Sequence, residues 1–204
     1  MTNRKINILI ITVLSITIYS CASFTKKRFR KEIENLNENS ISKMNGTYSF
    51  NPKRRYYSFV KEDANDRNPD SLTRNNAYDF LVNESYQKKK EFDSLRNKEN
   101  EYQVSLNLEN GNKLNVKVLE NSNVIKDTIF TGKYKNGMFY LDNKFLDCKG
   151  IPFIFGGCSN NKRRIGLTKK GNLLINEAVS NEGAILLIIG AGHSYNVTYE
   201  YERN

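Results

Sequence analysis

The chain has 204 residues, a formal net charge of +10, 38% hydrophobic residues and 11% aromatic residues. The mean hydropathy of -0.64 excludes a polytopic membrane protein, and the supply of apolar residues excludes a fully disordered chain. Three cysteines and one histidine exclude a four-cysteine cluster and a three-histidine zinc site, so no metal and no cofactor are expected.

Residues 1–20 have the pattern of an export signal. Two early cations are followed by a mainly apolar stretch that is shorter than the roughly 20 residues of a spanning helix. Residues 18–21, Ile-Tyr-Ser-Cys, resemble the lipobox of bacterial lipoproteins. The resemblance implies cleavage before Cys21 and acylation of its thiol. An ordinary signal peptide with an incidental cysteine and an uncleaved anchor are the alternatives.

Residues 21–43 are polar and charged, and we interpret them as a tether after the acylated cysteine. Five of the six residues 26–31 are cations. They could lie on anionic lipid at about 1 kcal/mol each, although a solvated spacer is the simpler interpretation. The expected partner is therefore the membrane, through acyl chains on Cys21. Nucleic acid is not expected, because no recognition motif is present.

At residue 44 the composition changes to that of a folded domain, which we expect to span 44–204. Residues 45–50 predict a strand. Residues 51–69 are polar and predict a long loop. Apolar residues at helical spacing then predict a short helical insertion over 70–99, after the first strand.

From residue 102 onward the apolar period becomes two, which predicts strands joined by tight turns. Turn signals stand at Asn110-Gly111, Asn136-Gly137 and Lys169-Lys170-Gly171. Glycines at 156–157 and 190–192 are interpreted as breaks between strands. The predicted strands are 102–108, 114–118, 124–134, 138–145, 151–155, 163–168, 172–179, 184–189 and 194–202.

These segments predict a mainly β fold, an antiparallel up-and-down barrel of about 8–10 strands, because closure hides the sheet edges. A two-sheet sandwich is the alternative. The alternating residues are large, so we expect a mostly packed interior, with any cavity at one end near the glycines. The residues expected to point inward are Val104, Leu106, Leu108, Leu114, Val116, Val118, Phe139, Leu141, Leu173, Ile175, Tyr195, Val197, Tyr199 and Tyr201.

Two features at the ends of the domain carry a family resemblance. Residues 45–48, Asn-Gly-Thr-Tyr, stand where lipocalins have Gly-x-Trp, and Arg203 follows the last strand, where that family often packs an arginine over the first-strand aromatic ring. With the run of hairpins, the domain resembles the lipocalin-like lipoproteins of the Gram-negative cell envelope. It departs from them in having no tryptophan and in its helical insertion. The resemblance implies a barrel with an apolar cavity and names no ligand.

No catalytic residue is expected. His193 stands beside Ser194, but adjacent residues of a strand point to opposite faces and cannot form a nucleophile–base pair there. Glu200 and Glu202 share a strand face, where an acid–base pair is the alternative to two solvated carboxylates.

Two further groups of residues could bind a ligand, although each also has a purely structural explanation. Tyr195, Tyr199 and Tyr201 share one strand face and are candidate ligand-facing residues, with core packing as the alternative. The run 162–164, Lys-Arg-Arg, could hold an anion, although a solvated turn is the simpler interpretation. Cys148 and Cys158 are a candidate disulfide for an oxidising compartment.

These expectations describe a membrane-anchored, non-enzymatic accessory or interaction protein of the cell envelope. The expected location is the outer membrane, on its periplasmic face. The alternatives are a carrier or sensor of a small apolar or amphipathic ligand, and an envelope hydrolase with an unrecognised site. An open barrel interior would favour the carrier, and a converging polar cluster would favour the hydrolase.

Overall fold

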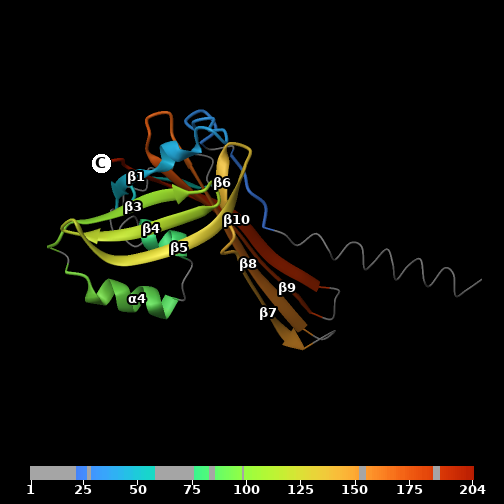
Figure 1. Cartoon of the computed structure of the whole chain (residues 1–204). Coiled ribbons are helices and arrows are strands. Elements are labelled where there is room, and N and C mark those ends of the chain that lie inside the picture. Colours follow the sequence, from blue (N-terminus) through green and yellow to red (C-terminus); the bar gives the residue numbers. More distant parts are fainter. Residues whose placement is uncertain are drawn as a thin grey trace, which may run out of the picture.

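The structure is a computed structural model that describes residues 22–26, 29–57, 76–82, 86–97, 99–151, 155–185 and 189–204. The lipobox-like residues 18–21 lie outside this part of the chain. The described part is mainly β: ten antiparallel strands form one sheet that curls into a half-barrel (Figure 1). The predicted mainly β, antiparallel class is therefore confirmed.

The sheet order is β1-β3-β4-β5-β6-β8-β9-β10-β2, and β7 pairs with the distal part of β8. A short 3-10 helix at Ile41–Met44 precedes the first strand. The strands and helices of the described residues are β1 (Gly46–Ser49), β2 (Arg54–Tyr57), α3 (Ala77–Val82), α4 (Tyr86–Leu95), β3 (Tyr102–Glu109), β4 (Lys113–Glu120), β5 (Asn123–Lys135), β6 (Met138–Leu141), β7 (Phe145–Ile151), β8 (Phe155–Leu167), β9 (Leu173–Ile185) and β10 (Ile189–Tyr201).

The predicted hairpin turns are confirmed by the backbone. Asn136 and Gly137 have φ values of 53° and 78°, and the flanking Lys135 and Met138 are paired. This is the two-residue turn in which both central residues need positive φ. Asn110-Gly111, between β3 and β4, also has positive φ at both residues.

Three expectations about the elements were wrong. The strand expected over 138–145 is interrupted at residues 142–144, between β6 and β7. Strand β2 lies within residues 51–69, which were expected to be a loop, so the described helices follow two strands instead of one. The glycines at 156–157 and 190–192 do not end strands, because β8 and β10 run through them for 13 residues each. The backbones approach closely there: a Cβ on Gly192 would lie 2.7 Å from the carbonyl oxygen of Asn181. Cross-strand pairing therefore overrides the local preference of glycine for turns.

The concave face of the sheet holds the main core. The residues predicted to point inward are buried in this core or, for Tyr195, packed against it. Helix α3 lies over the same face, where the Phe80 ring meets the Tyr199 ring edge-on with centroids 4.8 Å apart. Phe92 of α4 packs near Phe50, with ring centroids 6.4 Å apart. The predicted packed interior is confirmed for the described residues.

The two edges of the curled sheet are linked at one end by the chain after β10. The Ser49 amide donates to the Glu202 carbonyl at 2.7 Å, and the Asn204 amide donates to the Thr47 carbonyl at 3.0 Å. Between them the Arg203 guanidinium lies 5.3 Å from the centroid of the Tyr48 ring. Gly46 leaves room for this arginine, since a Cβ there would lie 2.7 Å from its Nη2 atom.

Residues 22–26 and 29–36, which we call the strap, lie against the outer face of the sheet. Phe29 and Ile33 are buried with Leu174 and Met138 in a second, smaller core. The Glu34 amide donates to the carbonyl of residue 167 at 2.8 Å. The segment expected to be a spacer thus contributes buried apolar side chains to the domain.

Beyond the half-barrel, β7 and the distal halves of β8, β9 and β10 continue as a four-stranded ribbon (Figure 1). It begins where Phe145 of β7 pairs with Asn161 of β8, and it extends six residues further. At roughly 3.3 Å per residue this is about 20 Å. The residues paired in register at its end, which we call the distal row, are Ile151, Phe155, Ile185 and Ile189.

Candidate functional site

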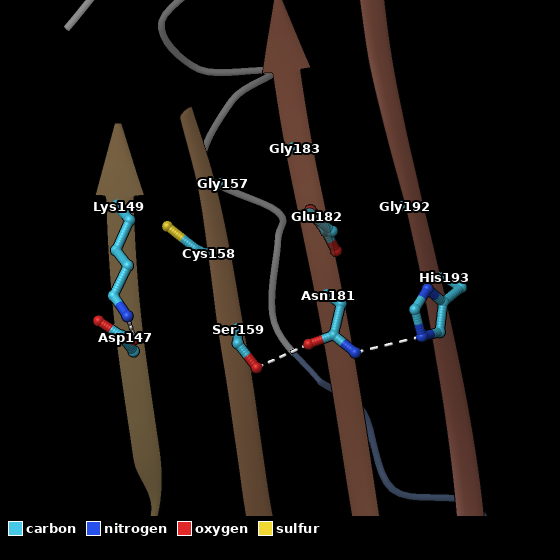
Figure 2. A pocket seen from close by; sticks show the side chains of 10 residues that line it. All are labelled: Asp147, Lys149, Gly157, Cys158, Ser159, Asn181, Glu182, Gly183, Gly192 and His193. Atoms are coloured by element: carbon cyan, nitrogen blue, oxygen red, sulfur yellow. Dashed lines mark hydrogen bonds and ion pairs between the residues drawn. The ribbon is translucent and has the colours of Figure 1, made fainter. Parts of the chain in front are cut away.

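A shallow, open hollow of about 540 Å³ lies on the ribbon (Figure 2). Its lining residues Ser159 and Asn181 lie an even number of residues from Ile165 and Ile175 of the core, so they share the face that continues the concave side of the sheet. The walls of the hollow are side chains of β7 and β10, and its floor is formed by β8 and β9. Gly157 and Gly183 are paired across β8 and β9 and lie in this floor. Because neither carries a side chain, the sheet surface is lowered there. The hollow adjoins the glycines beside which a cavity was expected.

A row of four polar residues crosses the hollow in register: Asp147, Ser159, Asn181 and His193. The Ser159 hydroxyl donates to the Asn181 side-chain oxygen at 2.6 Å, and the Asn181 Nδ2 atom lies 3.1 Å from His193 Nε2 (Figure 2). Asn181 therefore sits between the hydroxyl and the imidazole. The row thus places a carboxylate, a hydroxyl, an amide and an imidazole side by side across the ribbon.

The arrangement does not build a nucleophile and a base. Ser159 bonds to an amide oxygen, which cannot accept a proton as a general base does. Ser194, the neighbour of His193 in sequence, lies on the opposite face, where its hydroxyl donates to Ser180 at 3.1 Å. The His193 ring instead stacks parallel to Tyr195, with centroids 6.0 Å apart. In these contacts, neither Ser159 nor Ser194 is hydrogen-bonded to His193.

A disulfide joins the two strands of the ribbon edge beside the hollow. Cys148 of β7 and Cys158 of β8 are directly paired, with their Cα atoms 4.1 Å apart. In the neighbouring row, Lys149 forms an ion pair with Asp147 at 3.1 Å. The cross-link fixes β7 to β8 where β7 is the outermost strand.

Removing this disulfide is expected to lower the free energy of unfolding by about 2–3 kcal/mol, because the cross-link closes a short loop in the unfolded chain. The change is the double substitution Cys148→Ser and Cys158→Ser, and urea denaturation of the oxidised proteins measures it. Wild-type protein treated with dithiothreitol is the control and should match the double variant. Equal midpoints for the oxidised wild type and the variant would contradict the expectation.

A second polar cluster lies inside the core, under α3. Arg163 and Glu177 are 3% and 8% exposed and form a buried ion pair through Nη2 and Oε1. Desolvation lowers the pKa of Arg163, and the Glu177 carboxylate partly offsets this. Burial raises the pKa of Tyr201, and the nearby Tyr199 adds to the effect. The cluster is enclosed, so it holds charges in the core and offers no open surface to a substrate.

The remaining residues singled out in the sequence have structural contacts. Tyr199 and Tyr201 are buried in the core, and Tyr195 packs at its margin, which corresponds to the packing alternative for these tyrosines. Arg163 and Arg164 were expected in a solvated turn, but both are buried within β8, on opposite faces.

The two carboxylates at the end of the last strand, Glu200 within β10 and Glu202 just after it, are also paired. Glu200 accepts from Tyr56 at 2.8 Å and from Asn172 at 2.7 Å, whereas Glu202 pairs with Lys53 at 2.5 Å. Because both carboxylates are engaged in these contacts, Glu200 and Glu202 do not form a free acid–base pair. These interactions tie β10 to β2 and to the turn before β9.

Ser159 and Asn181 were not singled out in the sequence. A usable signal existed, because the turn at 169–171 sets which residues of β8 and β9 face each other. Counting outward from that turn pairs Ser159 with Asn181 if the strands are continued through the glycines.

Among the described residues, no three histidine, cysteine or carboxylate side chains are grouped as metal ligands require. Within the same part of the chain, no helix combines the length and the apolar character needed to cross a membrane. Comparisons with known proteins gave no match to the chain, whether with family models, with curated proteins or with solved structures.

Proposed function

We propose that this chain is a lipid-anchored accessory protein of the bacterial cell envelope. Acyl chains on Cys21 would hold it on the periplasmic face of the outer membrane. The half-barrel would serve as a packed, non-enzymatic scaffold for interaction. The anchor in this proposal comes from the lipobox-like residues 18–21.

The observation that carries the scaffold proposal is the filled concave face. A carrier needs an interior lined by side chains with space between them. Here Tyr48, Phe139 and Tyr201 are fully buried inside the sheet, and α3 adds Phe80 and Leu81 to the same core. The hollow of about 540 Å³ lies outside that core, on the ribbon. The geometry therefore favours a protein that presents surfaces over one that encloses a ligand.

Two features support the lipocalin-like part of the proposal. Strand β2 pairs with β10, and β1 bonds to the residues just after β10. Strands β6 and β7 both pair with β8. Each of these two pairs can therefore be counted as one interrupted strand. Counted so, the strands follow one another as in an up-and-down barrel. The stacking of Arg203 on Tyr48 is the contact that the resemblance implied.

The carrier remains a second candidate because the ribbon hollow is large enough for a small molecule. Organic extraction of the purified full chain, followed by mass spectrometry, separates the two proposals. A stoichiometric apolar molecule that is not attached to Cys21 would favour the carrier, and its absence would favour the scaffold.

Replacing Cys21 by serine is expected to release the protein from membranes or to leave it at its precursor mass, because serine offers no thiol for acylation. Membrane fractionation and intact-mass measurement of the expressed full chain check this result.

The matched control removes the other two cysteines, by Cys148→Ser and Cys158→Ser, and should leave the membrane fraction and the processed mass unchanged except for the two substitutions. A Cys21→Ser protein that is processed and partitions like the wild type would refute the anchor.

A further inference from the structure

The residues at the end of the ribbon are apolar, unlike the residues along the rest of its length. Residues 150–157 and 183–192 contain no charged or hydrogen-bonding side chain. The distal row consists of three isoleucines and one phenylalanine brought into register by four paired strands. Residues 152–154 and 186–188 lie outside the described residues, and in sequence they are Pro-Phe-Ile and Leu-Leu-Ile. An apolar composition at one end of an otherwise polar ribbon is the composition expected of an interaction site.

The polar composition begins again at a defined distance from the distal row. Lys149, whose side chain is 84% exposed, stands two residues before Ile151, and the polar row of Asp147 and His193 follows four residues from the distal row. At about 3.3 Å per residue, the apolar end is about 7–13 Å deep. That depth matches the roughly 5–10 Å to which interfacial segments enter a bilayer, and it is far less than a full span.

The strap indicates which partner the ribbon end meets. The Asn196 side chain of β10 holds the strap from both sides: it accepts from the Thr25 amide at 3.0 Å and donates to the Ser23 carbonyl at 2.8 Å. Further along, Arg164 donates to the Thr25 carbonyl at 2.9 Å. The strap therefore runs, toward its N-terminal end, along β8 and β10 in the direction of the ribbon (Figure 1).

The described part of the strap thus ends, at residue 22, with the chain directed toward the ribbon. Cys21 precedes Ser23 by two residues, which span at most about 7 Å. The distal row lies seven residues beyond Asn196 along β10, or about 23 Å. A bilayer that holds an acylated Cys21 would thus be within reach of the ribbon end. The apolar extremity and the strap that is directed to the same end of the molecule point to the same occupant.

We propose that the end of the β7–β10 ribbon, at Ile151, Phe155, Ile185 and Ile189, inserts into the interfacial region of the bilayer that carries the protein. The insertion gives the chain a second membrane contact, so the domain is held in a fixed orientation instead of moving freely about its anchor. This inference depends on the proposed acylation of Cys21 in one respect only, namely which end of the domain faces the bilayer.

The absence of tryptophan from the sequence gives a direct test. Phe155→Trp places a single fluorescent reporter in the distal row. Lys170→Trp places the same reporter in the turn at the other end of the β8–β9 hairpin, about 40 Å away along the strands. Each full chain is reconstituted into neutral phosphatidylcholine vesicles with and without doxyl-labelled phosphatidylcholine.

The expected result is an emission shift to shorter wavelength for Phe155→Trp and a loss of its intensity with the doxyl lipid, both absent for Lys170→Trp. Emission from Phe155→Trp that is equal to that of Lys170→Trp would overturn the proposal. A shifted emission that the doxyl lipid does not quench would also overturn it, because the reporter would then lie against protein. Ile185→Trp on the neighbouring strand gives the same reading if Phe155→Trp does not fold.

The intact mass of the same preparations separates this inference from the proposed function. Acylated Phe155→Trp protein whose indole is exposed to water would refute the insertion alone. Quenching in a chain without acyl groups would refute the anchor and leave the insertion standing.

Discussion

Replacing Glu177 by leucine is expected to lower the free energy of unfolding by about 3–5 kcal/mol, the usual cost of leaving one charge of a buried ion pair without its partner. Arg163 has a fixed charge, and its Nε and Nη1 atoms have no hydrogen-bond partner among the described residues. Only Nη2 meets a carboxylate, that of Glu177. Urea denaturation of the variant measures the loss.

The double variant Arg163→Met with Glu177→Leu should recover most of this stability, because two apolar side chains of similar volume replace the pair. Glu202→Gln serves as the exposed comparison. Its pair with Lys53 is 53% exposed on both sides, so its loss should cost less than about 1 kcal/mol. A Glu177→Leu protein within that range of the wild type would contradict the prediction.

Replacing Tyr48 by alanine is expected to cost about 3–5 kcal/mol, as for other large buried aromatic side chains. The ring is fully buried, its hydroxyl donates to the Met44 carbonyl at 2.8 Å, and Arg203 covers its face. The substitution removes all three contacts where the two sheet edges are linked. Thermal and urea unfolding measure the loss, and Tyr48→Phe should cost only about 1 kcal/mol because it keeps the ring.

The same tyrosine gives a pH test with a definite sign. Burial raises the pKa of Tyr48 to about 12 from 10.0, and Arg203 offsets part of the increase. The folded state therefore holds the phenolic proton more tightly than the unfolded state does. The resulting stability is complete below pH 10 and is lost as the pH rises to 12. Unfolding measured at about pH 8 and about pH 11 should show a smaller fall for Tyr48→Phe than for the wild type. An equal fall would assign the effect to Tyr56, Tyr102 and Tyr201, whose pKa values are also raised.

Local alternation was enough to predict the strands of the half-barrel. Val104, Leu106 and Leu108 alternate with polar residues, and the Asn110-Gly111 turn reverses the chain after them. One apolar face and one solvated face give this clear pattern. A strand, its buried face and the turn that follows it each depend on a few neighbouring residues, so all three can be predicted from the local sequence.

The ribbon could not be predicted in the same way. Gly156 faces Gly150 and Ala184, and Gly157 faces Gly183, so small residues meet small residues across the strands. Locally each glycine weakens a strand, and only the neighbouring strands show why it is tolerated. The polar row of the hollow depended on the same long strands, and it was missed for the same reason.

The strap was missed because its composition is that of a spacer. Its signal is the spacing of Phe29, Ile33 and Leu36, which recur three and four residues apart. Such short apolar periodicity is too common in polar segments to identify a docked one. What it docks against, the outer face of β8, β9 and β10, is specified more than a hundred residues later.

That distance in sequence has a consequence for the order of folding. The bonds from Asn196 to the strap join residues 171 and 173 positions apart, and β1 is linked to residues 202–204. Contacts so remote form only after the entropy of closing nearly the whole chain has been overcome. During synthesis the first segment to emerge must wait for the last one. The last nine residues therefore complete both the bonds of Asn196 to the strap and the link to β1. A chain that ends just before Asn196 would lose both, whereas a chain that ends just before residue 202 would lose only the link to β1.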